Sequence, residues 1–247
     1  MSVNLDEIWL EQSAKIKPIL ADGIEAVASH LPLARAMYAG DKILRCIDEG
    51  TPHGVHLCGS GILLGEPEAD AVVKKMMADG LEGITSHEEC GAAKIAAEKA
   101  GNTGDIETYT KEWAEKLAER LGLPYAGHTP ITAMKRPAGH HIARVAYYDS
   151  TGRFDYSAVP ELPAGFIISR KYLTPMQAQD ELRLALSIAT GAHGFGERLT
   201  AEEPFLILVI ADAESTELTA EAEAVAAEFA PRAIAQTLSI AQTLATA

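Results

Sequence analysis

The sequence lacks a long uninterrupted apolar run, and its basic residues are too few to balance its acidic ones. Of 247 residues, 21 are Lys or Arg and 35 are Asp or Glu, so the formal net charge is -14 at pH 7. Binding to phosphate groups needs clustered basic side chains, so this composition argues against nucleic acid or an anionic membrane surface as a partner. No stretch approaches the roughly 18 apolar residues of a membrane-spanning helix, and we therefore expect no membrane insertion.

Cysteine is also scarce, with only Cys46, Cys58 and Cys90 in the chain. An odd number of cysteines in a large chain makes a poor disulfide framework. The first twenty residues are amphipathic and acidic early, unlike a secretory signal or an Arg-rich transit peptide. We therefore expect a cytoplasmic protein whose cysteines are metal ligands or buried thiols.

Hydrophobic residues make up 47% of the chain and charged residues 23%, a balance typical of a globular protein. Apolar periodicity and turn residues predict strands and helices in alternation. This alternation predicts an α/β fold with a mostly parallel sheet flanked by helices, in a single domain over 1–247 without an internal repeat. The expected strands are 42–48, 81–86, 123–127, 142–148, 164–169 and 205–211, together with a strand that turns into a close-packed Gly-rich loop within 55–65. The expected helices are 4–30, 33–39, 66–78, 90–100, 106–121, 174–190 and 215–245.

Two short segments carry residue types that bind metal ions. Cys46 and Asp48 follow one predicted strand, and His87 and Cys90 follow another. The carboxyl ends of neighbouring parallel strands meet at one edge of a sheet, and thiolate and imidazole are preferred zinc ligands. Three such ligands leave a fourth position for water, whose pKa zinc can lower to about 7. Because a buried cysteine is also commonly a small apolar residue, the residues alone leave a chance arrangement open.

The order of these segments resembles the signature of the β-type carbonic anhydrases. It comprises Cys46-x-Asp48, the Gly-rich segment 58–65 and the H-x-x-C-G-A segment 87–92, followed by a Y-D-x-x-G hairpin at 148–152. Together these elements span roughly residues 41–155. The resemblance implies reversible hydration of CO2 to bicarbonate by zinc-bound hydroxide. It assigns Zn(2+) to Cys46, His87 and Cys90, the catalytic carboxylate to Asp48, and the substrate pocket to Gly59, Ser60 and Gly61.

The resemblance also implies an architecture. It predicts a β-carbonic anhydrase-like core at 41–155, an N-terminal helical arm at 1–40 and a C-terminal α/β extension at 156–247. We expect a homodimer or a multiple of dimers, in which the arm packs on the partner subunit and Trp9 anchors the interface. The departures from a minimal β-type enzyme make the chain similar to a divergent branch of the superfamily, the limiting-CO2-inducible B proteins, which resemble carbonic anhydrases with altered surroundings of the site.

The sequence departs from the family signature at Gly50. The family pattern is C-x-D-x-R, in which the arginine holds the aspartate away from the metal. Without it, Asp48 would be free to bind zinc as a fourth ligand and close the site, unless another arginine takes its place; the candidates are Arg45, Arg136, Arg144 and Arg153. Two alternatives follow: a non-catalytic zinc-stabilised binding or assembly protein, and a zinc hydrolase of another small CO2-like substrate.

The remaining candidates are a thiol and several histidines. Cys58 is expected to be a buried thiol that does not bind the metal. His140 and His141 directly precede the strand expected at 142–148. Adjacent side chains of an extended chain face opposite ways, so at most one of them is a proton shuttle. His193 lies among glycines in a functional loop or a tight turn. We expect His53 and His56 on the surface.

Overall fold

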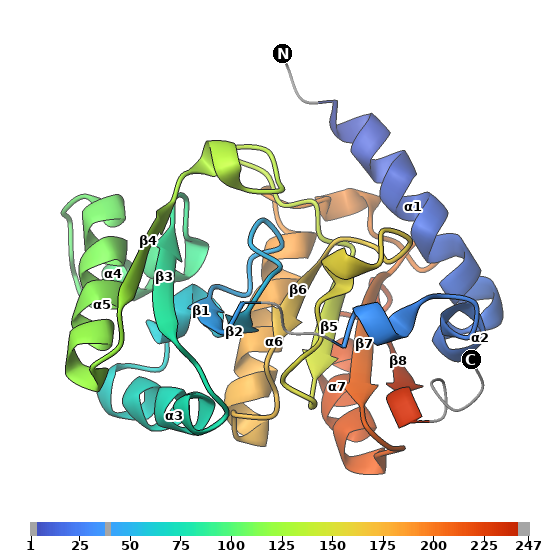
Figure 1. Ribbon diagram of the computed structural model, residues 1–247. Helices are drawn as coiled ribbons and strands as arrows, with labels where there is room; N and C mark the ends of the chain where they lie inside the picture. Colours follow the sequence, from blue (N-terminus) through green and yellow to red (C-terminus); the bar gives the residue numbers. More distant parts are fainter. Residues whose placement is uncertain (1–3, 38–40, 242–247) are drawn as a thin grey trace.

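The structure is a computed structural model that describes residues 4–37 and 41–241, and it confirms the α/β fold (Figure 1). Two four-stranded sheets, each entirely parallel, are flanked by helices. The helices are α1 (Leu5–Asp22), α2 (Ile24–Ala28), α3 (Glu66–Ala78), α4 (Gly91–Lys99), α5 (Ile106–Leu121), α6 (Pro175–Thr190) and α7 (Thr216–Glu228). The strands are β1 (Ile43–Arg45), β2 (Val55–His56), β3 (Gly83–His87), β4 (Tyr125–Thr129), β5 (Val145–Asp149), β6 (Gly165–Ile168), β7 (Phe205–Ala211) and β8 (Ala233–Ser239).

The two sheets have the same strand order. The first runs β2-β1-β3-β4 and the second β6-β5-β7-β8, and the strands of the two sheets point in opposite directions (Figure 1). The sheets meet beside β2 and β6, where the Ile167 N–H donates to the Ile47 carbonyl at 3.2 Å. The fold thus repeats a topology that the sequence does not repeat, and the carboxyl ends of the two sheets lie at opposite ends of the molecule.

One hydrophobic core joins the sheets. It contains Leu44 and Ile84 from the first sheet and Phe166 and Phe205 from the second, all essentially inaccessible to solvent. Every residue of β7 is buried, as expected for an apolar strand with both faces of its parallel sheet covered. This shared core holds the two halves of the chain in a fixed relation around the candidate site.

The expected helix at 215–245 is wrong in its second half. Helix α7 ends at Glu228, and Ala233–Ser239 form β8, which pairs in parallel with all of β7. Pro231 explains the break, because proline in a helix interior removes a hydrogen bond and clashes with the preceding turn. The last residues of that prediction, 242–245, lie outside the described part of the chain, as do residues 38 and 39 of the helix expected at 33–39.

The predicted N-terminal arm packs on its own chain. Helix α2 lies along β8, where the Ile24 N–H donates to the Gln236 side chain at 2.9 Å. Trp9 is 9% exposed, makes an edge-to-face contact with Phe195, and has the Arg144 guanidinium 3.8 Å from its ring centre. This corrects the prediction that Trp9 anchors an interface, because its surface is already used within the chain.

No helix in the described ranges is both long and apolar enough to cross a lipid bilayer.

Candidate metal centre

The structure brings together the three residues predicted to bind a metal ion. Cys46 follows β1, His87 ends β3, and Cys90 is the residue that precedes the first turn of α4. All three are buried, and their two sulfurs and one imidazole nitrogen lie within 4.8 Å of one another. Because β1 and β3 are parallel neighbours, segments forty residues apart in the sequence converge at one edge of the sheet. The predicted convergence is confirmed.

The histidine of this cluster is oriented for metal binding. The His87 Nδ1 atom lies 2.7 Å from the carbonyl oxygen of Glu88, which can only accept a hydrogen bond, so Nδ1 carries the hydrogen. In the neutral ring the lone pair is therefore on Nε2, which is buried and has no hydrogen-bond partner among the described residues. An unpaired buried nitrogen facing two thiols is costly unless an ion occupies the space. Two cysteines and one histidine thus fit a divalent metal such as zinc.

Protonation of the cluster depends on the neighbouring groups. A hydrogen bond with Cys90, followed by burial, raises the pKa of the Cys46 thiol well above its ordinary value. Burial alone would lower the pKa of His87, but Cys46 and Asp48 outweigh it and raise that pKa to about 9. Metal binding must displace these protons, so metal affinity should increase with pH.

Arg136 takes the place of the arginine that is missing at position 50. Its Nε donates to both carboxylate oxygens of Asp48, at 2.9 and 3.0 Å, and both side chains are buried. A Cβ at Gly50 would lie 3.0 Å from the Arg136 Cγ and 2.5 Å from the Met134 Cε, so the glycine makes room for this approach. Of the four arginines that the sequence left open, the structure identifies Arg136.

The carboxylate of Asp48 is held beside the cluster by this ion pair. Its Oδ1 also accepts the Gly50 N–H at 2.8 Å, while Oδ2 lies 4.0 Å from the His87 Nε2. Burial alone would raise the pKa of Asp48, but the charges of His87, His141 and Arg136 outweigh it and lower the pKa to about 2. Asp48 is therefore an ionised acceptor next to the three ligands.

Glu89, which lies between His87 and Cys90 in the sequence, holds Arg136 in place. Its carboxylate accepts hydrogen bonds from Arg136 at 3.3 Å and from the Gly139 N–H at 2.8 Å. Its backbone is left-handed (φ 56°), which is uncommon for a residue other than glycine. Sequence reasoning missed this role, because an acidic residue in a loop ordinarily faces solvent.

A cavity of about 550 Å³ opens next to the cluster. Its polar lining includes Cys90, Arg136 and His141. Its apolar wall combines residues of both halves of the chain, namely Ile95, Ile106, Leu184 and Ile188. The C-terminal segment thus contributes α6 to this cavity, a role that its sequence did not reveal.

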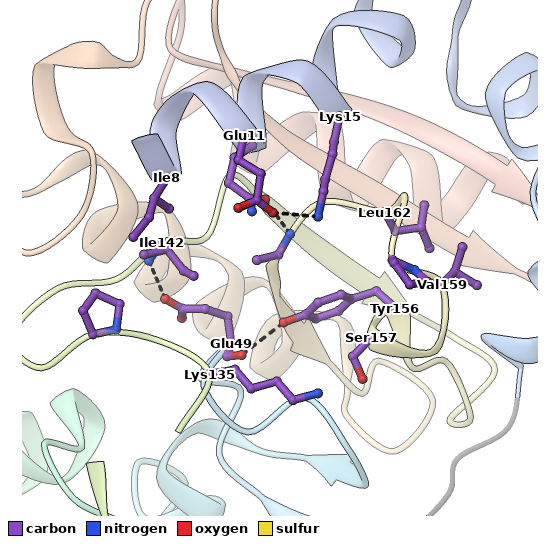
Figure 2. A pocket seen from close by; sticks show the side chains of 14 residues that line it. Ile8, Glu11, Lys15, Glu49, Lys135, Ile142, Tyr156, Ser157, Val159 and Leu162 are labelled. Carbon is purple, nitrogen blue, oxygen red and sulfur yellow. Dashed lines mark hydrogen bonds and ion pairs between the residues drawn. The ribbon is translucent and has the colours of Figure 1, made fainter. Parts of the chain in front are cut away.

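His141 and Glu49 form a pair between this cavity and a second hollow. His141 lines the cavity, and its Nδ1 lies 3.0 Å from the Glu49 carboxylate and 4.0 Å from that of Asp48. Burial alone would lower the pKa of His141, but Glu49 and then Asp48 outweigh it and raise it. On the other side, Glu49 borders a hollow of about 400 Å³, where the Tyr156 hydroxyl donates to the Glu49 backbone carbonyl (Figure 2).

The other histidines differ in their positions. His193 lies at the same cavity as His141, whereas His140 is not among its lining residues. His53 is half exposed. The prediction that His56 lies on the surface is wrong: it is buried, and its Nδ1 lies 2.7 Å from the Cys46 carbonyl. Burial lowers its pKa to about 4, so this histidine is a neutral support for the ligand strand.

The Gly-rich segment lies behind the ligands. Gly59, Ser60 and Gly61 are buried in a short 3-10 turn, and the Gly59 N–H donates to the Cys46 Sγ at 3.2 Å. They are not among the residues that line the cavity. Cys58, at the start of the turn, is buried and is not a member of the three-residue cluster.

Comparison with known proteins adds no family to this description. No protein-family model matches the chain, and no curated protein or solved structure matches it at a significant level.

Proposed function

We propose that this protein is a zinc-dependent enzyme of the β-carbonic anhydrase type that catalyses the reversible hydration of CO2 to bicarbonate. The observation that carries the proposal is the ion pair between Asp48 and Arg136. It holds the carboxylate beside the two cysteines and the histidine, outside the group of three candidate ligands. A site with three protein ligands keeps a position for a reactant, which distinguishes catalytic from structural zinc sites.

Cys46, His87 and Cys90 would hold the ion, which when bound supplies a Lewis acid that activates water at neutral pH. Asp48 would accept a hydrogen bond from the attacking water and orient its oxygen toward the cavity. Arg136 keeps that carboxylate ionised and in place. The apolar wall of the cavity would hold CO2, which needs no polar partner of its own, and His141 would remove the released proton toward solvent.

Two other functions fit the same metal centre. The protein could be a non-catalytic zinc-stabilised binding or assembly protein, or a zinc hydrolase of another small CO2-like substrate. The Asp48–Arg136 pair favours catalysis over the first, because a purely structural site has no use for an ionised acceptor beside its ligands. An activity assay decides between CO2 and another small CO2-like molecule as the substrate.

A stopped-flow pH-indicator assay of zinc-loaded protein tests the proposal. Wild-type protein should hydrate CO2 at pH 7 to 9, and Cys90→Ser should lose both zinc and activity. Cys58→Ser is the matched control, because it alters a buried thiol near the site that is outside the cluster. Stoichiometric zinc without activity would support the non-catalytic alternative, and turnover of a sulfur analogue but not of CO2 would support the hydrolase.

A further inference from the structure

Helix α6 carries a buried carboxylate that contacts the metal-ligand region from the other half of the chain. Glu181 is 5% exposed, and its Oε1 accepts the backbone N–H of Cys58 at 2.8 Å. Its Oε2 is buried and has no hydrogen-bond partner among the described residues. Burial raises the pKa of Glu181 to about 8. A half-satisfied acid in an apolar core is unfavourable, so its hydrogen bond to Cys58 calls for an explanation.

The backbone that Glu181 holds is the 3-10 turn behind the cysteines. The next N–H along the chain, that of Gly59, donates to the Cys46 Sγ. Gly59 and Ser60 both have left-handed backbones, with φ of 56° and 53°. This conformation is unfavourable for serine, so the turn needs outside contacts to persist.

The far end of the turn has contacts of its own. The Ser60 hydroxyl donates to the Thr85 carbonyl at 2.7 Å, and the Trp113 ring N–H donates to the Ser60 carbonyl at 3.3 Å. At the near end, the N–H of Cys58 is held by Glu181. The direction of the intervening Gly59 N–H therefore depends on a support from each side.

We propose that Glu181 is a positioning residue of the metal centre, which fixes the turn at Cys58 so that the Gly59 N–H points at the sulfur of Cys46. A hydrogen bond to a thiolate stabilises its negative charge and its orientation, and such supports commonly tune metal affinity. The inference rests on the metal centre of the proposed function but not on the substrate. It gives the C-terminal half a second role besides forming the cavity wall.

The test compares two substitutions that differ only in hydrogen bonding. Glu181→Gln keeps a carbonyl oxygen that can accept from Cys58, whereas Glu181→Met fills similar space without an acceptor. Glu221→Gln on α7 is the control. It alters a second buried glutamate, whose carboxylate pairs with Arg170 and Tyr148 rather than with the turn. The readouts are zinc affinity by chelator competition, the thiolate-to-cobalt charge-transfer band of the Co(II)-loaded protein, and amide hydrogen exchange of Gly59 in metal-free protein.

Glu181→Met should weaken zinc binding about 10- to 100-fold, shift the cobalt band and accelerate exchange at Gly59. Glu181→Gln should restore all three readouts, and Glu221→Gln should lower only the melting temperature. If Glu181→Met does not fold, Glu181→Asp replaces it, since the shorter acid keeps the charge but loses the reach to Cys58.

Two results would overturn the inference. One is an unchanged affinity, band and Gly59 exchange in Glu181→Met; the other is a defect in Glu181→Gln as large as that in Glu181→Met. Failure of the wild-type protein to bind metal would refute the proposed function instead. In that event the Gly59 exchange rates of the metal-free variants still decide whether Glu181 fixes the turn.

Discussion

The ends of β1 and β5 show the same local structure used in two ways. An aspartate closes a turn on the backbone two residues ahead in both places: Asp48 lies just after β1, and Asp149 is the last residue of β5. The Asp48 Oδ1 accepts the Gly50 N–H at 2.8 Å, and the Asp149 Oδ1 accepts the Thr151 N–H at 2.8 Å. Both strands occupy the same place in the order of their sheets. The turn itself therefore does not create a site.

The surroundings of the two aspartates differ. Asp48 is paired with Arg136, which helps lower its pKa to about 2, whereas burial raises the pKa of Asp149, whose partners are a hydroxyl and backbone N–H groups. The cysteines and histidine of the first half have no counterpart on β7, which is wholly apolar. The comparison indicates that the same turn becomes part of a candidate site only where an arginine and three metal-binding side chains surround it. The second half of the chain supports that site.

Removing the carboxylate charge in each half should give the largest contrast. We expect Asp48→Asn to lower kcat/KM for CO2 hydration about 10²- to 10⁴-fold, the range for an acid–base group in the transition state, with zinc content unchanged. Asp149→Asn should lower the melting temperature and leave kcat/KM close to wild type. Stopped-flow kinetics, zinc analysis and thermal unfolding measure these effects. Equal losses of activity in both variants would mean that the two turns do not differ in function.

Removing the arginine should have the next largest effect. We expect Arg136→Met to lower activity about 10- to 100-fold, because the support of Asp48 is lost. It should also lower the free energy of unfolding by about 3–5 kcal/mol, since a buried charge loses its partner. Arg170→Met, which breaks the Arg170–Glu221 pair of the second half, should affect stability alone. Partial recovery of Arg136→Met by added guanidinium would support the assigned role, and wild-type kinetics without it would contradict that role.

A smaller effect is expected at Gly59, which lies behind the ligands and away from the reacting atoms. Crowding there should weaken metal binding. A Cβ there would lie 2.5 Å from the Ile62 side chain and 2.8 Å from that of Ala92, at a φ of +56°. Gly59→Ala should therefore reduce zinc affinity as well as stability. Gly122→Ala has a similar φ of +67° with no atom within 4 Å, so it isolates the backbone cost of about 1–2 kcal/mol. Chelator competition and urea unfolding provide the measurements, and equal zinc affinities in the two variants would count against crowding.

The last contrast concerns the pH dependence of stability rather than catalysis. The pKa of Glu181 is about 8 in the folded protein against an ordinary value of 4.5, so between these values the folded state binds a proton that the unfolded state has released. Its contribution to stability therefore falls as pH rises from about 4.5 to 8. Glu181→Gln should remove this decline, most visibly at pH 8. Urea unfolding at pH 5 and 8 measures it; a wild-type decline that persists in Glu181→Gln would exclude Glu181 as its source.

The sequence was most informative where local chemistry decides the structure. Helices α3 and α5 match their predicted bounds, because their glycine ends and apolar periodicity are local signals. Cys46, His87 and Cys90 could be grouped because each follows a strand of a parallel sheet. Strand β8 differs from the predicted helix because the helical pattern continues past Pro231, whereas the proline itself ends the helix.

The supporting residues could not be predicted, because they come from distant parts of the chain. Arg136 reaches Asp48 across 88 residues, and Glu181 reaches Cys58 across 123. No local pattern distinguishes Arg136 from the three other candidate arginines. In the sequence Glu181 has the pattern of a polar residue on the exposed face of an amphipathic helix. The repeated strand order was likewise undetectable, because no internal sequence repeat accompanies it.

Zinc K-edge X-ray absorption on protein of measured metal content tests the central claim most directly. The account predicts one zinc per chain, with two sulfur ligands at about 2.3 Å and nitrogen or oxygen ligands at about 2.0–2.1 Å. Metal-free protein after exposure to excess zinc, or a shell with a third sulfur, would contradict it.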